Sequence, residues 1–491
     1  MVAIVRKAWR QLTSMRTALV LLFLLAVAAV PGSLLPQRGV AIEKVNDYLK
    51  NNPGAGPWLD RFYFFDVYSS PWFAAIYLLL FTSLVGCILP RLRTQAEALF
   101  RPLPDAPARP ERLPVSRTFD GTAEDFAARL KKARYRVAIR DGAVSAEKGY
   151  LRETGNLLFH SALIVLLVGV ALGSWYGWHG NRLIVAGPDG EFCNTLQQYD
   201  EYGLGARVGA SDLPEFCVRL DSFKASYLDS GQPLSFTANV GYLDGAKEGT
   251  HRLKVNEPLR LNGANVYLLA NGYAPILEYT DKFGRKLTTT VPFLNSDPML
   301  TSSGVAVFPD ANLDPATGKR EYGQQIGFQG VYLPTKPADP SVGRSAFPTE
   351  KDPALMLVAY RGDLGLDNGI PSSVYSLKQS QIDSGRLKPV GEPHMLVPGG
   401  EPWKLDDGTT VRFLGTKSWV AVSVRHDPGE PIMLTGAVLL LAGLLPSLAI
   451  RRRRVFYRDG QVGALAKNEY PGLGAELDQL LRDKDASEVR V

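Results

Sequence analysis

Cysteine and histidine are scarce in this chain of 491 residues, which contains three cysteines and five histidines. They form no Cys-x-x-Cys pair and no zinc-ligand spacing, and the chain also lacks a nucleophile elbow and a phosphate-binding loop. These absences argue against thioredoxin-like, hydrolase and nucleotide-binding classes of protein. The few histidines can therefore be weighed one at a time.

Charge is absent from four long apolar runs, at residues 17–35, 72–90, 155–173 and 431–450. At about 1.5 Å per residue, roughly 20 apolar residues cross the hydrocarbon core of a bilayer as a helix. We therefore predict four transmembrane helices. The first run exceeds the apolar core of a signal peptide, which has about 7–15 residues, so we expect it to remain in the mature protein.

The distribution of basic residues predicts the orientation of these helices. Residues 1–16 carry four basic and no acidic residues, residues 91–154 carry a basic excess, and arginines 451–454 follow the last run. Because Lys and Arg are retained on the cytoplasmic side, we expect segments 1–16, 91–154 and 451–491 to be cytoplasmic. Segments 36–71 and 174–430 should then lie outside the plasma membrane of a bacterium. The formal net charge of +6 follows this topology, so no nucleic-acid partner is expected.

The long outer segment, residues 174–430, reads as mostly antiparallel sheet. Its β-branched and alternating runs, such as residues 216–220, 354–360 and 409–424, are separated by Gly, Pro, Asn and Asp. The predicted fold class is an integral membrane α-helical protein with four transmembrane helices and a large extracytoplasmic β-rich domain between helices 3 and 4.

The cytoplasmic segments contain fewer signals. The loop at residues 91–154 has a candidate helix at 123–133 and a candidate strand at 135–139, which would suit a small folded unit. The tail at residues 451–491 has a charged candidate helix at 473–484 and otherwise polar character. We predict that this tail is a solvated appendage.

Two of the cysteines, Cys193 and Cys217, fall in the segment expected to face the oxidising exterior. A disulfide between them would close a loop of about 25 residues and contribute about 3 kcal/mol in the chain-entropy model. Two buried thiols are the alternative. Cys87 lies in the second apolar run and is most simply a small residue packed between helices.

His160 interrupts the third apolar run, about 7.5 Å along a helix from Gly155 and thus in the inner half of the bilayer. An ionisable side chain at membrane depth usually marks a pathway or ligand site, but it can also join two helices by a hydrogen bond. Apolar surroundings favour the neutral ring, whose lone pair is the axial ligand that haem iron accepts. From the residues alone, both roles stay open.

His179 and His426 lie just beyond the third run and just before the fourth, so both are expected near the outer membrane face. This position would suit haem ligands at an exit site. A histidine just outside a membrane helix is more often a simple interfacial residue, which is the alternative for both.

Several groups of residues together resemble one family of membrane proteins. Near the membrane runs these are residues 14–19, 32–37, 87–91 and 148–160. In the outer segment they are Val255, Asn256, Glu257, Pro258 and Leu259, then Gly263 and Tyr267, and finally Asp427, Pro428 and Gly429. With these residues in this order, the sequence is identified as a member of the ResB family, the CcsB-type component of system II cytochrome c maturation.

The resemblance implies a non-autonomous subunit of a haem transporter and cytochrome c synthetase. Haem b would be bound transiently and carried outward, and an integral membrane partner of the CcsA/ResC type would complete the complex. Apocytochrome c would receive the haem, and thiol-reducing proteins would be further partners. His160 is similar in position to the family's membrane histidine, which favours its role as a haem ligand.

Two other functions compete with haem transport. The first is a membrane-anchored assembly scaffold or apocytochrome chaperone that does not handle haem, in which His160 is structural. The second, a haem-bearing electron carrier, is weaker because a bis-histidine site within one chain needs ligands on facing helices, and the other three apolar runs contain no histidine.

Overall fold

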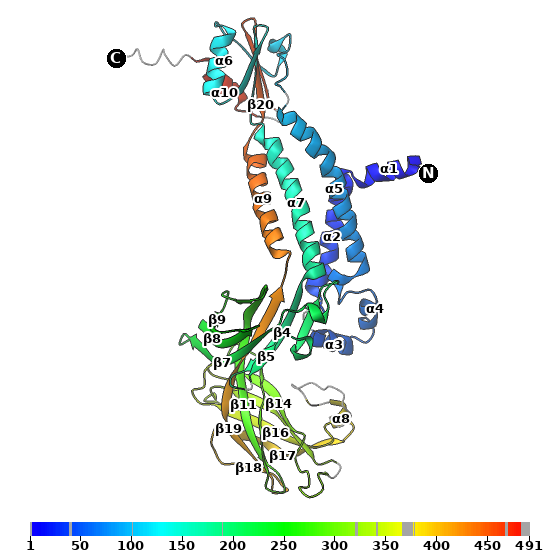
Figure 1. Ribbon diagram of the computed structural model, residues 1–491, viewed down its shortest axis with the longest axis vertical. Helices are drawn as coiled ribbons and strands as arrows, with labels where there is room; N and C mark the ends of the chain where they lie inside the picture. Colours follow the sequence, from blue (N-terminus) through cyan, green and yellow to red (C-terminus); the bar gives the residue numbers. More distant parts are fainter. Residues whose placement is uncertain are drawn as a thin grey trace, which may run out of the picture. The chain divides into compact units, whose positions relative to one another are not determined.

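The computed structural model describes residues 2–38, 42–100, 102–188, 190–319, 323–339, 342–365, 377, 379–466 and 470–482 (Figure 1). Two compact units make up the chain. One comprises Met1–Trp175 and Pro428–Val491, and the other is Tyr176–Asp427, which is referred to below as the large domain. The predicted fold class is confirmed in its two main parts, four helices suited to a membrane and a β-rich region between the third and the fourth.

Among the described residues, four helices are long and apolar enough to cross a membrane. They are α2 (Met15–Leu34), α5 (Pro71–Phe100, apolar as far as Leu92), α7 (Leu151–Tyr176) and α9 (Glu430–Ala449). Only 6% to 17% of the residues in these spans are buried within the protein. Their apolar side chains therefore need lipid or another protein around them.

Glycines allow α7 and α9 to pack closely, and Figure 1 shows these two helices side by side. A Cβ on Gly443 would lie 2.4 Å from the backbone nitrogen of Phe159, and one on Gly429 would lie 2.0 Å from the carbonyl oxygen of Gly169. Gly436, midway between them, faces Leu166 in the same way. Small residues at a seven-residue spacing let two backbones approach where lipid provides no hydrophobic drive.

Two neighbouring polar residues, Gln37 and Arg38, connect parts of the segment between α2 and α5. It contains α3 (Ile42–Asn51), α4 (Gly56–Arg61) and the 3-10 turn η1 (Val67–Ser69). The Gln37 side chain donates to the Phe64 carbonyl and accepts from the Val67 amide, at 3.1 Å each. Arg38 forms ion pairs with Asp60 and Asp66. These contacts tie the end of α2 to the start of α5.

A five-stranded sheet with two helices forms what we call the small domain, and it joins two distant parts of the chain. The strand order is β1-β21-β20-β3-β2, and all neighbours are antiparallel. Its elements are β1 (Val115–Thr118), α6 (Ala123–Lys132), β2 (Arg136–Arg140), β3 (Ala143–Lys148), β20 (Arg453–Arg458), β21 (Gln461–Ala466) and α10 (Leu473–Leu481), with the 3-10 turn η2 (Pro110–Arg112) beside them.

The prediction that the tail is a solvated appendage is wrong. β20 lies between β21 and β3, and its Val455, Phe456 and Tyr457 are all buried in the small domain. Helix α10 buries Leu473 and Leu477 in the same core. The tail completes a core that the loop at residues 91–154 only half provides, so both segments are needed to bury their apolar faces. Residues 483 and 484 of the predicted helix lie outside the described residues.

The described part of the large domain forms three antiparallel sheets. The first has seven strands: β4 (Trp178–Val185), β6 (Glu201–Leu204), β10 (Leu259–Leu261), β11 (Ala264–Thr280), β12 (Lys286–Thr290), β18 (Trp403–Lys404) and β19 (Thr410–His426). The second has β13 (Leu294–Asn295), β14 (Ser302–Phe308), β15 (Gln325–Leu333), β16 (Ala354–Gly362) and β17 (Leu387–Leu396). The third has β5 (Glu191–Cys193), β7 (Phe216–Tyr227), β8 (Pro233–Asp244) and β9 (Lys247–Lys254).

The long strands β11 and β19 connect the two cores of the large domain. They pair from Asn265–Arg425 to Thr280–Thr410, with two register shifts along the way. The half of β19 nearer its end contributes Val420, Val422 and Val424 to one core, and the half nearer its start contributes Val411 and Phe413 to the other. Alternate residues of each half face inward. The two cores lie along different stretches of the ribbon, so the same pair of strands contributes to both.

Candidate functional site

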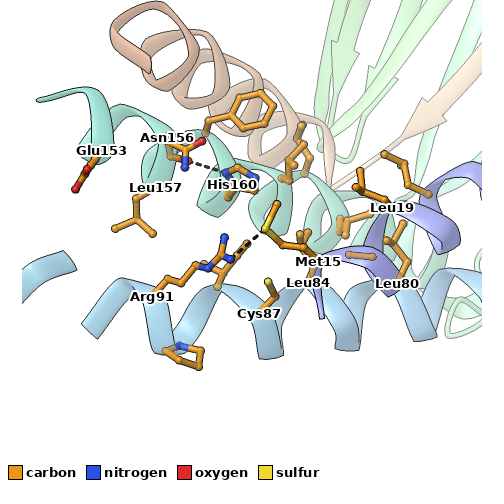
Figure 2. A pocket seen from close by; sticks show the side chains of 18 of the residues that line it. Met15, Leu19, Leu80, Leu84, Cys87, Arg91, Glu153, Asn156, Leu157 and His160 are labelled. Carbon is orange, nitrogen blue, oxygen red and sulfur yellow. Dashed lines mark hydrogen bonds between the residues drawn. The ribbon is translucent and has the colours of Figure 1, made fainter. Parts of the chain in front are cut away.

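A cavity of about 820 Å³ lies among α2, α5 and α7. Figure 2 shows His160 and Asn156 on α7 facing the stretch of α5 that carries Leu84, Cys87 and Arg91. Most of the lining is aliphatic. The volume falls within the range of about 300–1,000 Å³ that is usual for sites that hold cofactors and small molecules.

His160 is held in one orientation by its own helix. Its Nδ1 lies 2.7 Å from the carbonyl oxygen of Asn156, one turn earlier in α7. A carbonyl oxygen only accepts hydrogen bonds, so Nδ1 carries the proton and donates it. In a neutral ring the other nitrogen, Nε2, keeps its lone pair, and it takes no hydrogen bond within the described part of the chain. The neighbouring Phe159 ring stands edge-on to the imidazole, with 5.2 Å between the ring centroids.

The donor set around His160 suits a porphyrin-bound metal better than a bare ion. Among the described residues, no group of three or more His, Cys, Asp or Glu side chains could hold a metal ion. Haem iron needs only axial ligands, because the porphyrin supplies the other four nitrogens. A single imidazole beside a largely apolar cavity is therefore compatible with one axial bond to haem iron.

One cation, Arg91, borders the largely aliphatic cavity. Arg91 on α5 donates to the sulfur of Met15 on α2 at 3.1 Å (Figure 2). Glu153 also lines the cavity but is bound to Arg452 at 2.6 Å. The sequence gives Arg91 a topological role only, and its place after Pro90 at the end of the apolar run is the signal that could have drawn attention to it.

The structure does not bring His179 and His426 together. In the pairing of β4 with β19, His179 lies opposite Arg425 and His426 lies opposite Trp178. Successive residues of a strand face opposite sides of the sheet, so the two imidazoles point to different faces. These two residues therefore cannot ligate one iron from both sides.

His426 is nevertheless oriented much as His160 is. Its Nδ1 lies 2.8 Å from the Gly263 carbonyl oxygen, so it donates there and leaves Nε2 with a lone pair. Its ring stacks on Trp178 at a centroid distance of 6.2 Å and an angle of 26°. His179 instead lies over the backbone of Gly203, where a Cβ would come within 2.5 Å of its ring.

The motif around residue 260 builds the hairpin that positions His426. Asn262 and Gly263 both have positive φ, +48° and +81°, and connect β10 to β11 in the manner of an Asn-Gly turn. The motif residues lie in the turn before β10, in β10, in the hairpin turn and in β11: Val255, Asn256, Glu257, Pro258, Leu259, Gly263 and Tyr267. Leu259 is buried in the core of the large domain, and Glu257 pairs with Lys254 at 3.2 Å. Within the described contacts, these residues shape the fold.

The second motif, Asp427, Pro428 and Gly429, precedes α9. Arg425 contacts the Asp427 carboxylate at 3.3 Å. Pro428 falls at the boundary between the two units, and Gly429 provides the close contact with α7 described above. Their role in the structure is to start the fourth span.

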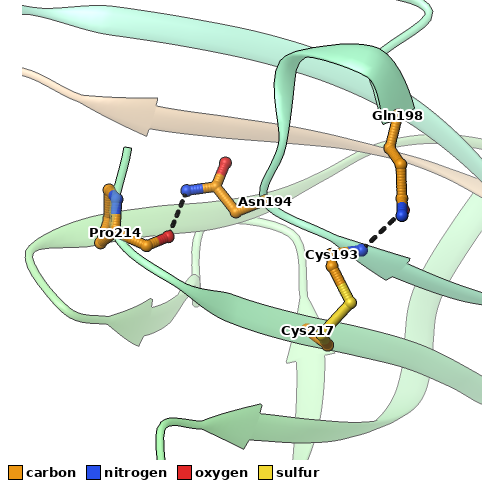
Figure 3. The surroundings of a disulfide bond; sticks show 5 residues. All are labelled: Cys193, Asn194, Gln198, Pro214 and Cys217. Carbon is orange, nitrogen blue, oxygen red and sulfur yellow. Dashed lines mark hydrogen bonds between the residues drawn. A yellow bond between two sulfur atoms is a disulfide. The ribbon is translucent and has the colours of Figure 1, made fainter. Parts of the chain in front are cut away.

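Cys193 and Cys217 form a disulfide bond, shown in Figure 3. They are direct partners in the pairing of β5 with β7. The Cys193 amide donates to the side-chain oxygen of Gln198 at 2.7 Å, and the Asn194 amide group donates to the Pro214 carbonyl at 2.7 Å. The bond fastens the short edge strand β5 to its sheet, and Cys87, in contrast, is a free thiol in the cavity lining.

Comparisons with known proteins match nearly the whole chain. The model of the ResB-like family matches residues 15–478. Relatives named cytochrome c biogenesis protein CcsB occur in Gloeobacter violaceus (24% identical over 96% of this chain and 89% of the relative) and Thermosynechococcus vestitus (25%, 96% and 92%). Another, from a Synechococcus species, is 26% identical over 98% of this chain and 97% of the relative. Since the family model covers both units and all four spans, this chain belongs to the ResB-like family.

Proposed function

We propose that this chain acts in cytochrome c biogenesis as the partner-dependent subunit of a membrane complex that carries haem outward and attaches it to apocytochrome c. The relatives named CcsB support the role in cytochrome c biogenesis. One observation carries the haem-handling part of the proposal. His160 presents the lone pair of Nε2 beside an apolar cavity of about 820 Å³ within the spans.

In this proposal His160 binds the iron of haem b, the cargo, from one side. The neutral imidazole provides one axial ligand, and the aliphatic lining covers the porphyrin faces and limits water at the iron. The second axial ligand comes from the partner, because α2, α5 and α9 contain no histidine. A CcsA/ResC-type membrane protein is the partner that we infer.

The proposed orientation puts the small domain in the cytoplasm and the large domain outside the plasma membrane. The basic segment before α2 and the arginines after α9 support it through the positive-inside rule. Haem synthesised inside then reaches His160 in the inner half of the bilayer and leaves toward the large domain. That domain receives apocytochrome c, whose haem-binding thiols are kept reduced by separate thiol-reducing proteins.

A haem spectrum of the purified full-length chain, with and without its co-expressed partner, tests the proposal. We expect Soret absorbance in the complex and its loss, by about tenfold or more, in His160→Ala. His394→Ala is the matched control, since His394 is an exposed residue of the large domain that stacks on Trp403.

Two outcomes would contradict the proposal. An anchored scaffold that does not handle haem predicts the same absorbance for wild type and His160→Ala. A haem-bearing electron carrier predicts full absorbance from this chain without any partner.

A further inference from the structure

A second cavity, of about 680 Å³, lies where α7 begins and α9 ends, next to the small domain. It is basic. Its polar lining comes from Arg134, Lys148, Arg451, Arg453 and Tyr470. The haem proposal makes no use of it.

The four arginines that follow α9 have different surroundings, and they differ in whether an acidic side chain compensates their charge. Arg452 pairs with Glu147 and with Glu153, and Arg454 lies 3.7 Å from Glu147. Arg453 pairs with Glu476 at 2.7 Å. Arg451 is exposed and has no acidic partner among the residues that the structure describes. Three of the arginines therefore face carboxylates of the small domain and of α7, and the fourth, Arg451, does not.

Two more cations of this cavity are also left without an acid. Neither Arg134 nor Lys148 forms an ion pair within the described ranges. The Lys148 ammonium lies 5.3 Å from the centre of the Tyr135 ring, and the Arg451 guanidinium lies 5.1 Å from that of Tyr470. An aromatic face orients a cation but does not neutralise it. The cavity thus keeps about three uncompensated positive charges.

The backbone holds these charges together. Lys148 pairs with Arg453 in the sheet, where β3 meets β20. The next residue, Gly149, has a φ of +83°, and a Cβ there would lie 2.2 Å from the carbonyl oxygen of Arg451. Only glycine permits so close an approach in that conformation. The crossing of the two chain segments therefore fixes Lys148 and Arg451 on the same cavity.

The rim of the cavity suits a membrane surface. Tyr150 and Leu151 are 43% and 48% exposed, and Ala449 and Ile450 line the same side. These residues stand at the ends of two spans, the level at which lipid headgroups meet protein. Basic pockets at this level between spanning helices bind the phosphates of anionic lipids.

We propose that this cavity binds the phosphate of an anionic phospholipid headgroup, of which phosphatidylglycerol is the probe of choice. Arg134, Lys148 and Arg451 contact the phosphate, and the acyl chains lie along the apolar rim. A free phosphate ester shares the phosphate chemistry but lacks the chains. The inference does not depend on haem handling, and its test has a lipid readout.

Native mass spectrometry of the full-length chain in detergent tests this site. Dioleoyl phosphatidylglycerol is titrated against wild type, the Arg134→Gln/Arg451→Gln double variant, and a Lys132→Gln control. Lys132 is an exposed residue at the end of α6 that does not line the cavity. Removing two cations near a phosphate should weaken phosphatidylglycerol binding about thirtyfold, since each is worth about a factor of five. The control and an Arg134→Lys/Arg451→Lys variant should stay within about threefold of wild type.

Several results would overturn the inference. Wild-type affinity in the double variant would do so, as would an equal loss in Lys132→Gln, or equal binding of dioleoyl phosphatidylcholine. Glycerol 3-phosphate binding as tightly as the lipid would indicate a soluble phosphate ester instead. Circular dichroism checks the fold, and if the double variant does not fold, each single Gln variant should lose about fivefold.

Discussion

His160 in the membrane spans and His426 in the large domain are oriented in the same way but have different surroundings. Each donates from Nδ1 to a backbone carbonyl, at 2.7 Å and 2.8 Å, and each leaves Nε2 with its lone pair. His160 opens onto a cavity of about 820 Å³, whereas His426 stacks on the buried Trp178. The two rings are thus oriented in the same way, but of the two it is His160 that has a cavity beside it.

An imidazole with an available lone pair is therefore not enough to define a haem site. A ring oriented by a backbone carbonyl follows from local geometry, either one helical turn or one hairpin. A cavity large enough for a porphyrin requires that α2, α5 and α7 leave space between their side chains. The haem proposal therefore rests on the cavity as much as on the histidine.

Filling the cavity while keeping His160 should produce the largest effect. Leu84→Trp adds bulk to the cavity lining, and we expect haem retention in the complex to fall about tenfold, because overpacking costs about 1–3 kcal/mol. The measurement is Soret absorbance per protein. Leu78→Trp on the same helix is the control, since Leu78 is 59% exposed and lies outside the lining. Equal retention in both variants would mean that the cavity does not hold the porphyrin.

Removing the disulfide should affect the large domain and spare the cavity. The Cys193→Ala/Cys217→Ala variant should lose about 3 kcal/mol of unfolding free energy in that domain, because the bond closes a loop of about 25 residues. Chemical denaturation followed by Trp fluorescence measures this. Haem retention should match wild type. A parallel loss of haem would show that the large domain and the cavity are coupled, which contradicts this prediction.

Widening the contact between α7 and α9 should act on the His160 side alone. In Gly443→Ala, the new Cβ would lie 2.4 Å from the backbone of Phe159, next to His160, so the helices must separate. We expect a loss of about 1–3 kcal/mol in the unfolding free energy of the spans in micelles. Ala442→Leu, at an exposed neighbouring position, is the control. Wild-type stability of Gly443→Ala would contradict the close packing.

Replacing His179, which lies in the large domain like His426, should give the smallest effect. Although the residue as a whole is exposed, desolvation of its ring where it packs over Gly203 lowers its pKa from the ordinary value of 6.5, while the Glu201 carboxylate raises the pKa and Arg425 lowers it. As the pH falls through about 6.5, the unfolded chain takes up a proton that the folded ring resists, so the large domain loses stability. His179→Gln should flatten this slope between pH 7 and pH 5 in denaturation experiments. An unchanged slope would mean that the ring is not effectively buried.

Local patterns predict part of this structure, and contacts between distant segments account for the rest. Runs without charge predict the four spans because the cost of burying a charge in lipid can be judged from the residues of each run alone. The tail is different. Val455, Phe456 and Tyr457 read as a short apolar run in a polar tail, and only their pairing with β3 makes them the middle of a sheet.

The candidate site divides in the same way. His160 stands out in the sequence as an ionisable residue in an apolar run, and its hydrogen bond to the Asn156 carbonyl is local to its own helix, whereas the cavity beside it depends on three helices. The opposite facing of His179 and His426 depends on strand register, which two isolated histidines do not reveal.

Chemical rescue with imidazole tests whether His160 ligates the haem iron. The His160→Gly complex is purified with its partner, and haem is added back with and without imidazole while the Soret band is recorded. We predict that haem is lost without imidazole and that the band returns as imidazole takes the position of the missing ring, while His426→Gly keeps its haem and does not respond. A His160→Gly complex that holds haem with an unchanged spectrum in the absence of imidazole would contradict the claim that His160 ligates the iron.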